Sequence, residues 1–562
     1  MPSPSDRVLP RCLLCSMHCA VGAKDDGLGH VGTVYPADLG VERGACVRAL
    51  TAARLLGAPE RFFEARQADE PALAADVIQQ ISHALKNAEG AEVAVIADLN
   101  RPMEGVTALA ELCRKVGARF GVFAPPEDLP LVRAGVTGCP PFARIAECDQ
   151  LFVVGDPFST HPAIAAYMRD VQFGARGNRI VCVDAANGRT ARGADTAILV
   201  PPAKLAAFMA AAAVSLGVDS VRESLGGLSA ERICDQMGLD REQIGAWGQM
   251  REAKAPGIIL SNSVGRYSHP GAVSAIVGEI ASAVGCPRWP LLTASNSYAL
   301  PYLRERYGAL SSGEVLEVAN SGAIELLLVV GWDPSAVLPE RFWRGLADKC
   351  ETVCWAGSID SPFAQVADIV LPLALAWEEK GTVLDAAGKP AAFEPWLAKP
   401  APVLDTAALA DGLAFASGLG KIEAPGFETV GTPRVASEAV SERILEAPEP
   451  ASGEAIVVGA PEPHGYGGGI PLGVSRWQRR LAGEEAALVT ADLAREVGLE
   501  ASGLLKVSDQ TEFTVPYRLD GGAGRVVAMP AHWGALRELL QWQEAGGALE
   551  PAPALVQIEK CE

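Results

Sequence analysis

The chain has 562 residues, of which 49% are hydrophobic and 21% are charged, and its formal net charge is −20. This length exceeds what one hydrophobic core supports, so it predicts several domains. The negative charge argues against nucleic acid or an anionic membrane surface as a partner. No apolar run is long enough to span a bilayer, and residues 1–11 lack the apolar core of a signal peptide. We therefore expect a soluble, cytoplasmic protein.

The first expected unit, residues 1–72, holds four of the thirteen cysteines. Cys12, Cys15 and Cys19 follow the spacing Cys-x2-Cys-x3-Cys, and Cys46 follows after 26 intervening residues. In a reducing compartment, clustered cysteines are typical of metal ligands. A [4Fe–4S] cluster takes four thiolates, which this motif supplies. Zinc, which prefers two Cys-x2-Cys pairs, and chance clustering of core cysteines are the alternatives. We predict a [4Fe–4S] cluster, whose potential Arg48 could tune by its charge, a solvated Arg48 being the alternative.

After residue 72, short apolar strands alternate with helices, which indicates parallel α/β structure. A first α/β domain is expected over residues 73–250, with strands at Ala91–Ala97, Gln150–Val154 and Arg179–Asp184 and helices at Met103–Val116 and Pro162–Phe173. A second is expected over residues 251–398, with strands at Gly257–Leu260, Ile324–Val330, Thr352–Trp355 and Ala367–Pro372.

Two stretches of these domains suggest an internal duplication. L-F-V-V-G-D-P at 151–157 and L-L-L-V-V-G-W-D-P at 326–334 each precede a strand and then an Ala-Asp step, at Asp195 and Asp368. Nucleotide-like ligands bind at the carboxyl ends of parallel strands, where glycine lets the backbone approach them. Ordinary turns are the alternative interpretation. The candidate cofactor-binding residues are Gly155, Asp156, Pro157, Asp184, Gly331, Asp333 and Pro334.

The last two expected units differ in composition. Residues 399–474 are rich in Pro, Ala, Glu and Gly, which is typical of a linker or of an arm that a partner contacts. Residues 475–562 combine a helix at Thr490–Val497 with strand runs at 503–507, 512–517 and 525–529. This pattern predicts a small β-barrel domain.

With these parts in order, the chain resembles the molybdopterin oxidoreductase superfamily. That group includes formate dehydrogenases, nitrate reductases, formylmethanofuran dehydrogenase and the large iron–sulfur subunit of respiratory complex I. The matching segments are the cysteine motif, V-V-G-D-P-F-S-T-H-P at 153–162, V-V-G-W-D-P-S-A at 329–336, A-D-I-V-L-P-L-A-L-A-W-E-E-K-G-T at 367–382 and L-V-T-A-D-L-A-R-E-V-G-L at 488–499. The resemblance implies an α/β fold with a small N-terminal iron–sulfur domain, duplicated Rossmann-like domains and a C-terminal double-psi-like β-barrel. It also implies molybdopterin guanine dinucleotide with molybdenum or tungsten.

One departure from the family bears on activity. Catalytic members supply a Cys, selenocysteine, Ser or Asp to the metal about thirty-five residues before the first turn, where this chain has Phe120–Pro130 without a cysteine. Its carboxylates are Glu127 and Asp128, and we expect Asp128 to be solvated because aspartate usually is. The sequence thus leaves the catalytic residues unassigned.

The first functional hypothesis is an electron-transfer subunit like that of complex I, with one cluster and no metal site. Its partners would be redox subunits that carry iron–sulfur clusters or flavin, and any peripheral membrane association would come through them. The second is an active molybdenum or tungsten enzyme of the formate or formylmethanofuran dehydrogenase type. A scaffold that binds neither cofactor is a third. His532 and Trp533 could line a cofactor tail, but packing inside the barrel is favoured slightly.

Overall fold

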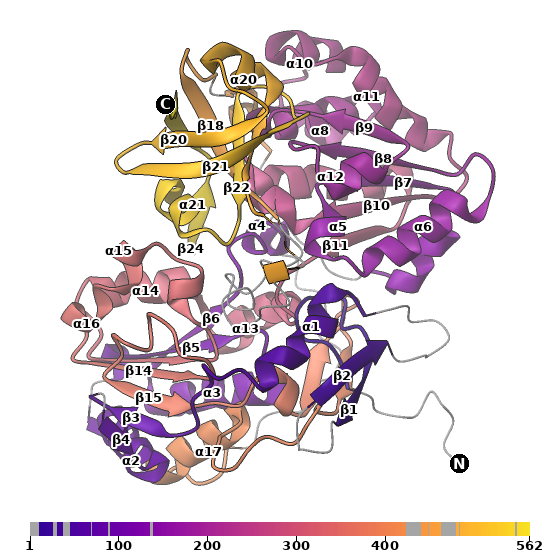
Figure 1. Cartoon of the computed structure of the whole chain (residues 1–562). Coiled ribbons are helices and arrows are strands. Elements are labelled where there is room, and N and C mark those ends of the chain that lie inside the picture. Colours follow the sequence, from indigo (N-terminus) through magenta and orange to yellow (C-terminus); the bar gives the residue numbers. More distant parts are fainter. Residues whose placement is uncertain are drawn as a thin grey trace, which may run out of the picture.

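The computed structural model describes residues 10–25, 31–36, 45–68, 70–87, 90–134, 139–422, 440–447, 449–461, 479–480, 482, 484–545 and 548–561. Two α/β units, a closed barrel and a small N-terminal unit surround a common centre (Figure 1). The fold class expected from the sequence is confirmed. The glycine-rich part of the expected arm, 465–469, lies outside the described residues.

One α/β unit is built on a five-stranded parallel sheet. Its strand order is β11 (Arg288–Leu291), β10 (Pro256–Ser261), β7 (Gln150–Val154), β8 (Arg179–Asp184) and β9 (Thr196–Leu199). The central strands β7, β8 and β10 are almost wholly buried, as expected where helices cover a parallel sheet. Among the covering helices are α6 (Ile164–Gly174), α8 (Leu205–Ser215) and α12 (Pro270–Val284).

The other unit is built on an eight-stranded sheet. Its order is β12 (Leu310–Ser311), β6 (Arg119–Phe123), β5 (Val93–Asp98), β13 (Leu326–Val330), β14 (Thr352–Gly357), β15 (Ile369–Pro372), β3 (Ala65–Gln67) and β4 (Glu70–Ala72). The pairs from β12 to β15 are parallel, and β3 and β4 add antiparallel pairs.

Each of the two sheets contains strands from both sides of the domain boundary expected at residue 250. Strands β5 and β6 join the sheet that contains β13, whereas β10 and β11 join the sheet that contains β7. The five-stranded unit is therefore inserted in the chain between β6 and β12 of the eight-stranded unit. Sequence periodicity predicts that a strand exists, but not which strand pairs with it.

The predicted duplication is present in the backbone of the two turns. Gly155 and Gly331 both have positive φ, 85° and 81°. The Gly155 N–H donates to the carbonyl of Val183 at 2.9 Å, and the Gly331 N–H donates to that of Ala356 at 2.8 Å. Each glycine thus ties the end of its strand to the neighbouring strand in a conformation that favours glycine.

The two Ala-Asp steps repeat a second detail. Oδ2 of Asp195 accepts the N–H of Ile180 at 2.8 Å, and Oδ2 of Asp368 accepts the N–H of Val353 at 2.8 Å. Ile180 and Val353 are the second residues of β8 and β14. These aspartates therefore have the same structural task in both units, which is to satisfy a backbone donor at a strand start.

The C-terminal barrel contains β18 (Glu454–Ala460), β22 (Val526–Pro530), β19 (Ala487–Thr490), β21 (Glu512–Asp520), β20 (Ser502–Ser508) and β25 (Ala554–Lys560), in that order around it. It also carries α20 (Ala491–Val497) and α21 (Gly534–Leu539). The expected β-barrel is confirmed. Strand β18, however, comes from the range expected to be a linker.

The same range contains α17 (Thr406–Ala416), which packs against α2 (Ala74–Asn87) and α3 (Met103–Val116). Leu409 and Leu413 of α17 are fully buried. The Pro and Gly content of residues 399–474 concealed this amphipathic helix, so the expected linker is wrong for this part of the range.

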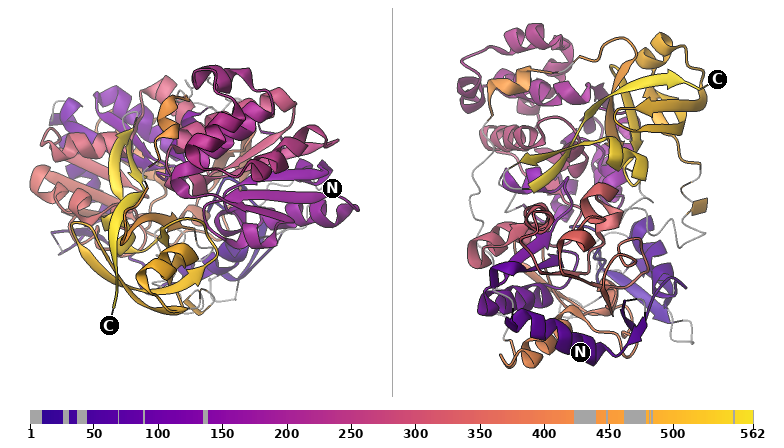
Figure 2. Two further views of the ribbon diagram at one scale, coloured as in Figure 1. Left: turned by 90° about the horizontal axis from the view of Figure 1, so that it is seen from above. Right: turned by 90° about the vertical axis from the view of Figure 1, so that its left-hand side faces the viewer.

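The N-terminal unit consists of β1 (Val21–Asp25), β2 (Val31–Pro36) and α1 (Val47–Leu56). It packs beside the hairpin of β16 (Gly381–Leu384) and β17 (Pro390–Phe393), and its core joins Cys12 and Leu13 to Trp377 and Phe393. Figure 2 shows this unit and the barrel on different levels of the molecule. Every helix in the described ranges is too short or too polar to cross a membrane.

Candidate functional site

The four N-terminal cysteines come from one closed loop and one helix start. The N–H of Cys12 donates to the carbonyl of Cys19 at 2.9 Å, which closes the loop around Cys15. Cys46 is the N-cap residue of α1. The start of a helix favours negative charge and therefore a thiolate.

Three of these thiols influence one another. Burial first, and then the charge of Cys46, raise the pKa of Cys15 to about 12. The pKa of Cys12 is also raised, by burial first and then by Cys46 and Cys15, while Arg48 lowers both. Buried thiolates so close together need positive charge between them, and this is the environment that suits bound iron.

Within the described ranges, no three His, Cys, Asp or Glu side chains converge tightly enough to hold a single metal ion. The cysteine set accordingly does not form a compact single-ion site. In a [4Fe–4S] cluster, by contrast, each thiolate binds its own iron at a different corner of the cube, so the ligands stand apart.

The cysteine loop is anchored to the five-stranded unit. His18 donates from Nε2 to the carbonyl of Ser295 at 2.8 Å, and Ser16 and Leu292 exchange two hydrogen bonds of 3.0 Å. Burial lowers the pKa of His18 to about 4, so its ring is neutral at pH 7. His18 is thus an anchor for the loop.

A central cavity of about 320 Å³ lies beside this loop. Its walls come from the cysteine segment (Leu13, Leu14), from residues after β5 and β13 of one sheet and after β10 of the other, and from the barrel. The cavity is therefore at the carboxyl ends of parallel strands, where α/β proteins bind ligands. Other lining residues include Arg48, Asp98, Arg101, Glu127, Thr160, Asn262, Arg266, Gly331, Trp377, His532 and Arg537.

Four arginines give the cavity positive charge. Arg101 pairs with buried Glu379 at 2.6 Å, and Arg266 pairs with Glu127 at 2.7 Å. The other two donate to carbonyl oxygens, Arg48 to Ser159 at 2.9 Å and Arg537 to Ala336 at 2.6 Å. A site with this charge suits an anion. Sequence analysis singled out only Arg48, because the others belong to no recognisable motif.

Several polar atoms around the cavity lack hydrogen-bond partners. They are Oδ1 of Asn262, Nη1 of Arg266, Nε1 of Trp377 and Nδ1 of His532, all buried and all without a partner among the described residues. A buried polar atom without a partner costs about 1–3 kcal/mol. Four such atoms on side chains of one cavity are available to water or to a bound molecule with several hydrogen-bonding groups. A pterin dinucleotide, with its heterocycles and phosphates, has this chemistry.

Of the seven predicted cofactor residues, only Gly331 lines this cavity. The Asp156 carboxylate caps two helix starts, since it accepts from Ser159 (N–H 3.3 Å, Oγ 2.7 Å), from Thr190 (N–H 3.0 Å, Oγ1 2.6 Å) and from the Arg189 N–H at 3.1 Å. Asp333 accepts likewise from Ser335. Their local role is structural, and their contact with a cofactor stays a prediction, as it does for Gly155, Pro157 and Pro334.

Asp184 differs from these two aspartates. Its Oδ1 accepts from the Tyr267 hydroxyl and the Ala185 N–H, both at 2.8 Å, but its buried Oδ2 has no partner among the described residues. Burial and the nearby Asp156 raise the pKa of Asp184 to about 7. One acceptor of Asp184 is thus unused by the described residues, and its contact with a cofactor stays a prediction.

The expectation that Asp128 is solvated is wrong. It is fully buried, and its Oδ1 accepts from Asn262 at 3.1 Å and the Thr293 N–H at 2.8 Å. Its Oδ2 accepts from the Ala294 N–H at 3.0 Å and the Ser297 hydroxyl at 2.7 Å. These donors are distant in sequence, so nothing near Asp128 predicted them. Of the two carboxylates of this segment, Glu127 is the one that lines the cavity.

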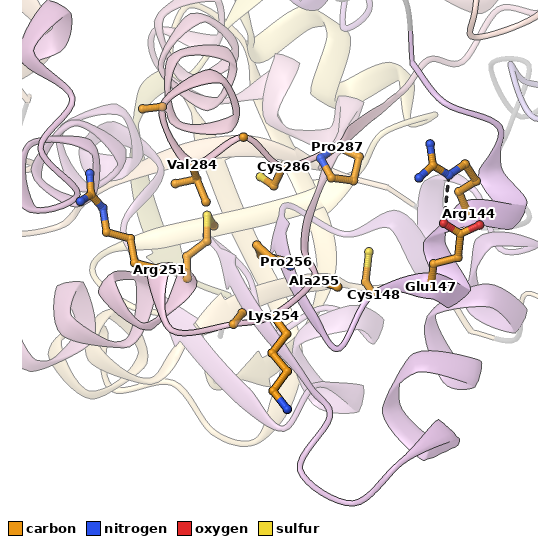
Figure 3. Close-up of a pocket in the computed structure, with 14 residues that line it drawn as sticks. Arg144, Glu147, Cys148, Arg251, Lys254, Ala255, Pro256, Val284, Cys286 and Pro287 are labelled. Atoms are coloured by element: carbon orange, nitrogen blue, oxygen red, sulfur yellow. Dashed lines mark hydrogen bonds and ion pairs between the residues drawn. The ribbon is translucent and has the colours of Figure 1, made fainter.

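A larger pocket, of about 580 Å³, lies at the opposite ends of the same strands (Figure 3). Cys148 and Cys286 line it, just before β7 and β11, together with Lys254 and the surface ion pair of Arg144 and Glu147. Its position at the amino ends of a parallel sheet is not where α/β proteins bind cofactors. We therefore take the central cavity as the candidate site.

Comparison with known proteins agrees with this geometry. No curated protein matches the chain by sequence. Among solved structures, acetylene hydratase from Pelobacter acetylenicus superposes with a TM-score of 0.72 over 99% of this chain and 100% of that one, at 13% identity. This identity supports a shared fold. The family model for molybdopterin oxidoreductase matches residues 74–401, more than half of the chain. The chain therefore belongs to the molybdopterin oxidoreductase family.

Proposed function

We propose that this chain is an oxidoreductase that binds molybdopterin guanine dinucleotide, with molybdenum or tungsten, in its central cavity. This is the second of the functions expected from the sequence. The observation that carries it is the group of four unpartnered polar atoms, on side chains that line one arginine-rich cavity. In a chain that had lost its cofactor, packing by its own side chains would be expected to fill such a space.

The proposal includes a [4Fe–4S] cluster on Cys12, Cys15, Cys19 and Cys46. Leu13 and Leu14, between the first two cysteines, line the cavity, so the cluster would adjoin the cofactor. Such a cluster exchanges single electrons. Arg48 contributes to both places, since it lowers the pKa values of Cys12 and Cys15 and lines the cavity.

The metal would receive oxygen rather than sulfur from the protein. Among the described residues, no cysteine lines the cavity, whereas Glu127 and Asp98 do. Burial raises the pKa of Asp98 to about 6. Glu127 lies in the segment where the family resemblance placed a metal ligand, and Arg266 holds its carboxylate at 2.7 Å.

The absence of a lining thiol also favours a second candidate, an electron-transfer subunit without molybdenum or tungsten. In either case the cluster needs an electron partner, and we propose a separate redox protein that carries iron–sulfur clusters or flavin. The chain described here supplies one set of four clustered cysteines, so the next centre would be the partner's.

Elemental and cofactor analysis of anaerobically purified protein tests the proposal. We expect about four irons per chain, molybdenum or tungsten in near-stoichiometric amount, and a fluorescent pterin after oxidation. Iron without pterin, molybdenum or tungsten would favour the electron-transfer subunit. Zinc in place of iron would refute the cluster. Cys46→Ser should lower the iron content, whereas Cys561→Ser, at a cysteine outside the motif, should leave it unchanged.

A further inference from the structure

A carboxylate–histidine pair lies at the barrel side of the central cavity. Oε2 of Glu485, just before β19, lies 3.0 Å from Nε2 of His532 and also accepts the Trp533 Nε1–H at 3.0 Å. An indole nitrogen only donates, and an ionised carboxylate only accepts. The Nε2 atom of His532 must therefore carry the hydrogen, which fixes the tautomer of the ring.

The other ring nitrogen is free. The His532 side chain is only 9% exposed, and its Nδ1 is buried without a partner among the described residues. In the tautomer that Glu485 imposes, Nδ1 carries a lone pair and is an acceptor. Packing alone does not account for an acceptor in this position, because leaving it unpaired has a cost.

The charges around the ring determine its protonation. Burial lowers the pKa of His532, and Arg537 and Arg266 lower it further, while Glu485 raises it. Arg266 is itself paired with Glu127, and Arg537 lies near Asp333. With the cavity empty, burial and the arginine charges thus favour the neutral ring. An anion bound between the arginines would offset them and favour the imidazolium.

We propose that His532 is the proton acceptor of the central cavity, and that Nδ1 takes a hydrogen bond, and then the proton, from an O–H or N–H group of an anionic ligand. The inference rests on the proposed function in that a ligand occupies this cavity. In the transfer, the ligand's O–H or N–H bond breaks and an Nδ1–H bond forms. Glu485 stabilises the resulting imidazolium, which later returns the proton to the ligand or to water.

The test is the pKa of His532, measured by NMR on the full chain with labelled histidine and assigned with His532→Gln. Gln can keep the contact with Glu485 but has no titrating nitrogen. Inorganic phosphate is the probe anion. We expect the pKa of His532 to lie above about 6.5 when the cavity holds an anion. The anion is either one that copurifies with the protein or added phosphate. The expected rise with phosphate in cofactor-free chain is about one pKa unit or more.

Two variants sharpen the result. Glu485→Gln should reduce the anion-dependent rise, because the imidazolium loses its counter-charge. His161→Gln is the control, since both ring nitrogens of His161 are already bonded, to Thr160 and Leu292, and it should leave the rise intact. A His532 pKa that stays below 6.5 with and without phosphate would overturn the proposal. A rise with phosphate in cofactor-free chain would support it whether or not elemental analysis finds pterin, so this proposal and the proposed cofactor fail separately.

Discussion

The buried ion pair of Arg61 and Glu378 should control how firmly the fourth cysteine is held. Arg61 donates to both carboxylate oxygens of Glu378, at 2.9 and 2.8 Å, and also to the carbonyl of Leu56 at 2.8 Å. Leu56 is the last residue of α1, and Cys46 caps the start of that helix. The pair thus ties α1, the helix whose start carries Cys46, to the segment at 375–379.

The expected cost of breaking this pair is large. Both side chains are almost inaccessible, at 2% and 1% exposure, and Glu378→Gln would leave the guanidinium buried without its counter-charge. Removal of one partner of a buried pair typically costs about 3–5 kcal/mol. At about 1.4 kcal/mol per tenfold change, local opening of α1 should become roughly 10²- to 4 × 10³-fold more frequent.

Hydrogen exchange followed by mass spectrometry measures this opening. Amides of α1 and of residues 375–379 should exchange faster in Glu378→Gln by that factor, and the variant should lose iron sooner under a chelator. Asp492→Asn, in the exposed pair with Arg495, is the matched control and should change little. Equal protection of α1 in both variants would refute the argument that this pair holds the helix.

Three further predictions concern the two glycine turns, the buried hydrogen bonds of Asp128, and pH. An alanine methyl at Gly331 would meet Arg101 and Asp98, and one at Gly155 would meet Ser263 and Ser261, so both substitutions should lower the denaturation midpoint. Because Gly331 lines the cavity, Gly331→Ala should lower pterin content more than Gly155→Ala does, and equal pterin loss in both would contradict this. Asp128→Asn replaces an oxygen that accepts two hydrogen bonds with an NH2 group that faces donors, and should lower the free energy of unfolding in urea by about 2–4 kcal/mol. An unchanged urea midpoint would show that these hydrogen bonds do not stabilise the fold. Burial lowers the pKa of His161 to about 3, so as pH falls below about 6.5 the unfolded chain binds a proton at this histidine before the folded chain does, and folding stability is lost between pH 6.5 and 3. In thermal unfolding, His161→Gln should lose less stability over that pH range than the unsubstituted protein, and identical pH profiles would refute this prediction.

The local structure was largely predictable from the sequence. The strands at Gln150–Val154 and Arg179–Asp184 and the helix at Met103–Val116 have the predicted bounds, because buried apolar runs and helical periodicity are local signals. The duplication was equally visible, since glycine at positive φ followed by a capping Asp is a short-range pattern.

The site was less predictable because it is assembled from distant segments. Asp128 gains its partners from residues 262–297, and Arg101, Arg266 and Arg537 meet only once two sheets and the barrel surround one cavity. The sequence pattern directed attention to Asp156 and Asp333, whose carboxylates cap helices. Conversely, the free nitrogen of His532 follows from the position of Glu485 forty-seven residues earlier, which no local pattern indicates.

The central claim is that a [4Fe–4S] cluster and a metal-bearing pterin lie side by side in this chain. Electron paramagnetic resonance of the anaerobically reduced protein tests it most directly. The account predicts the signal of a reduced [4Fe–4S] cluster together with a molybdenum or tungsten signal whose relaxation is enhanced by the nearby cluster. A cluster signal alone, in protein that contains no molybdenum, tungsten or pterin, would contradict it.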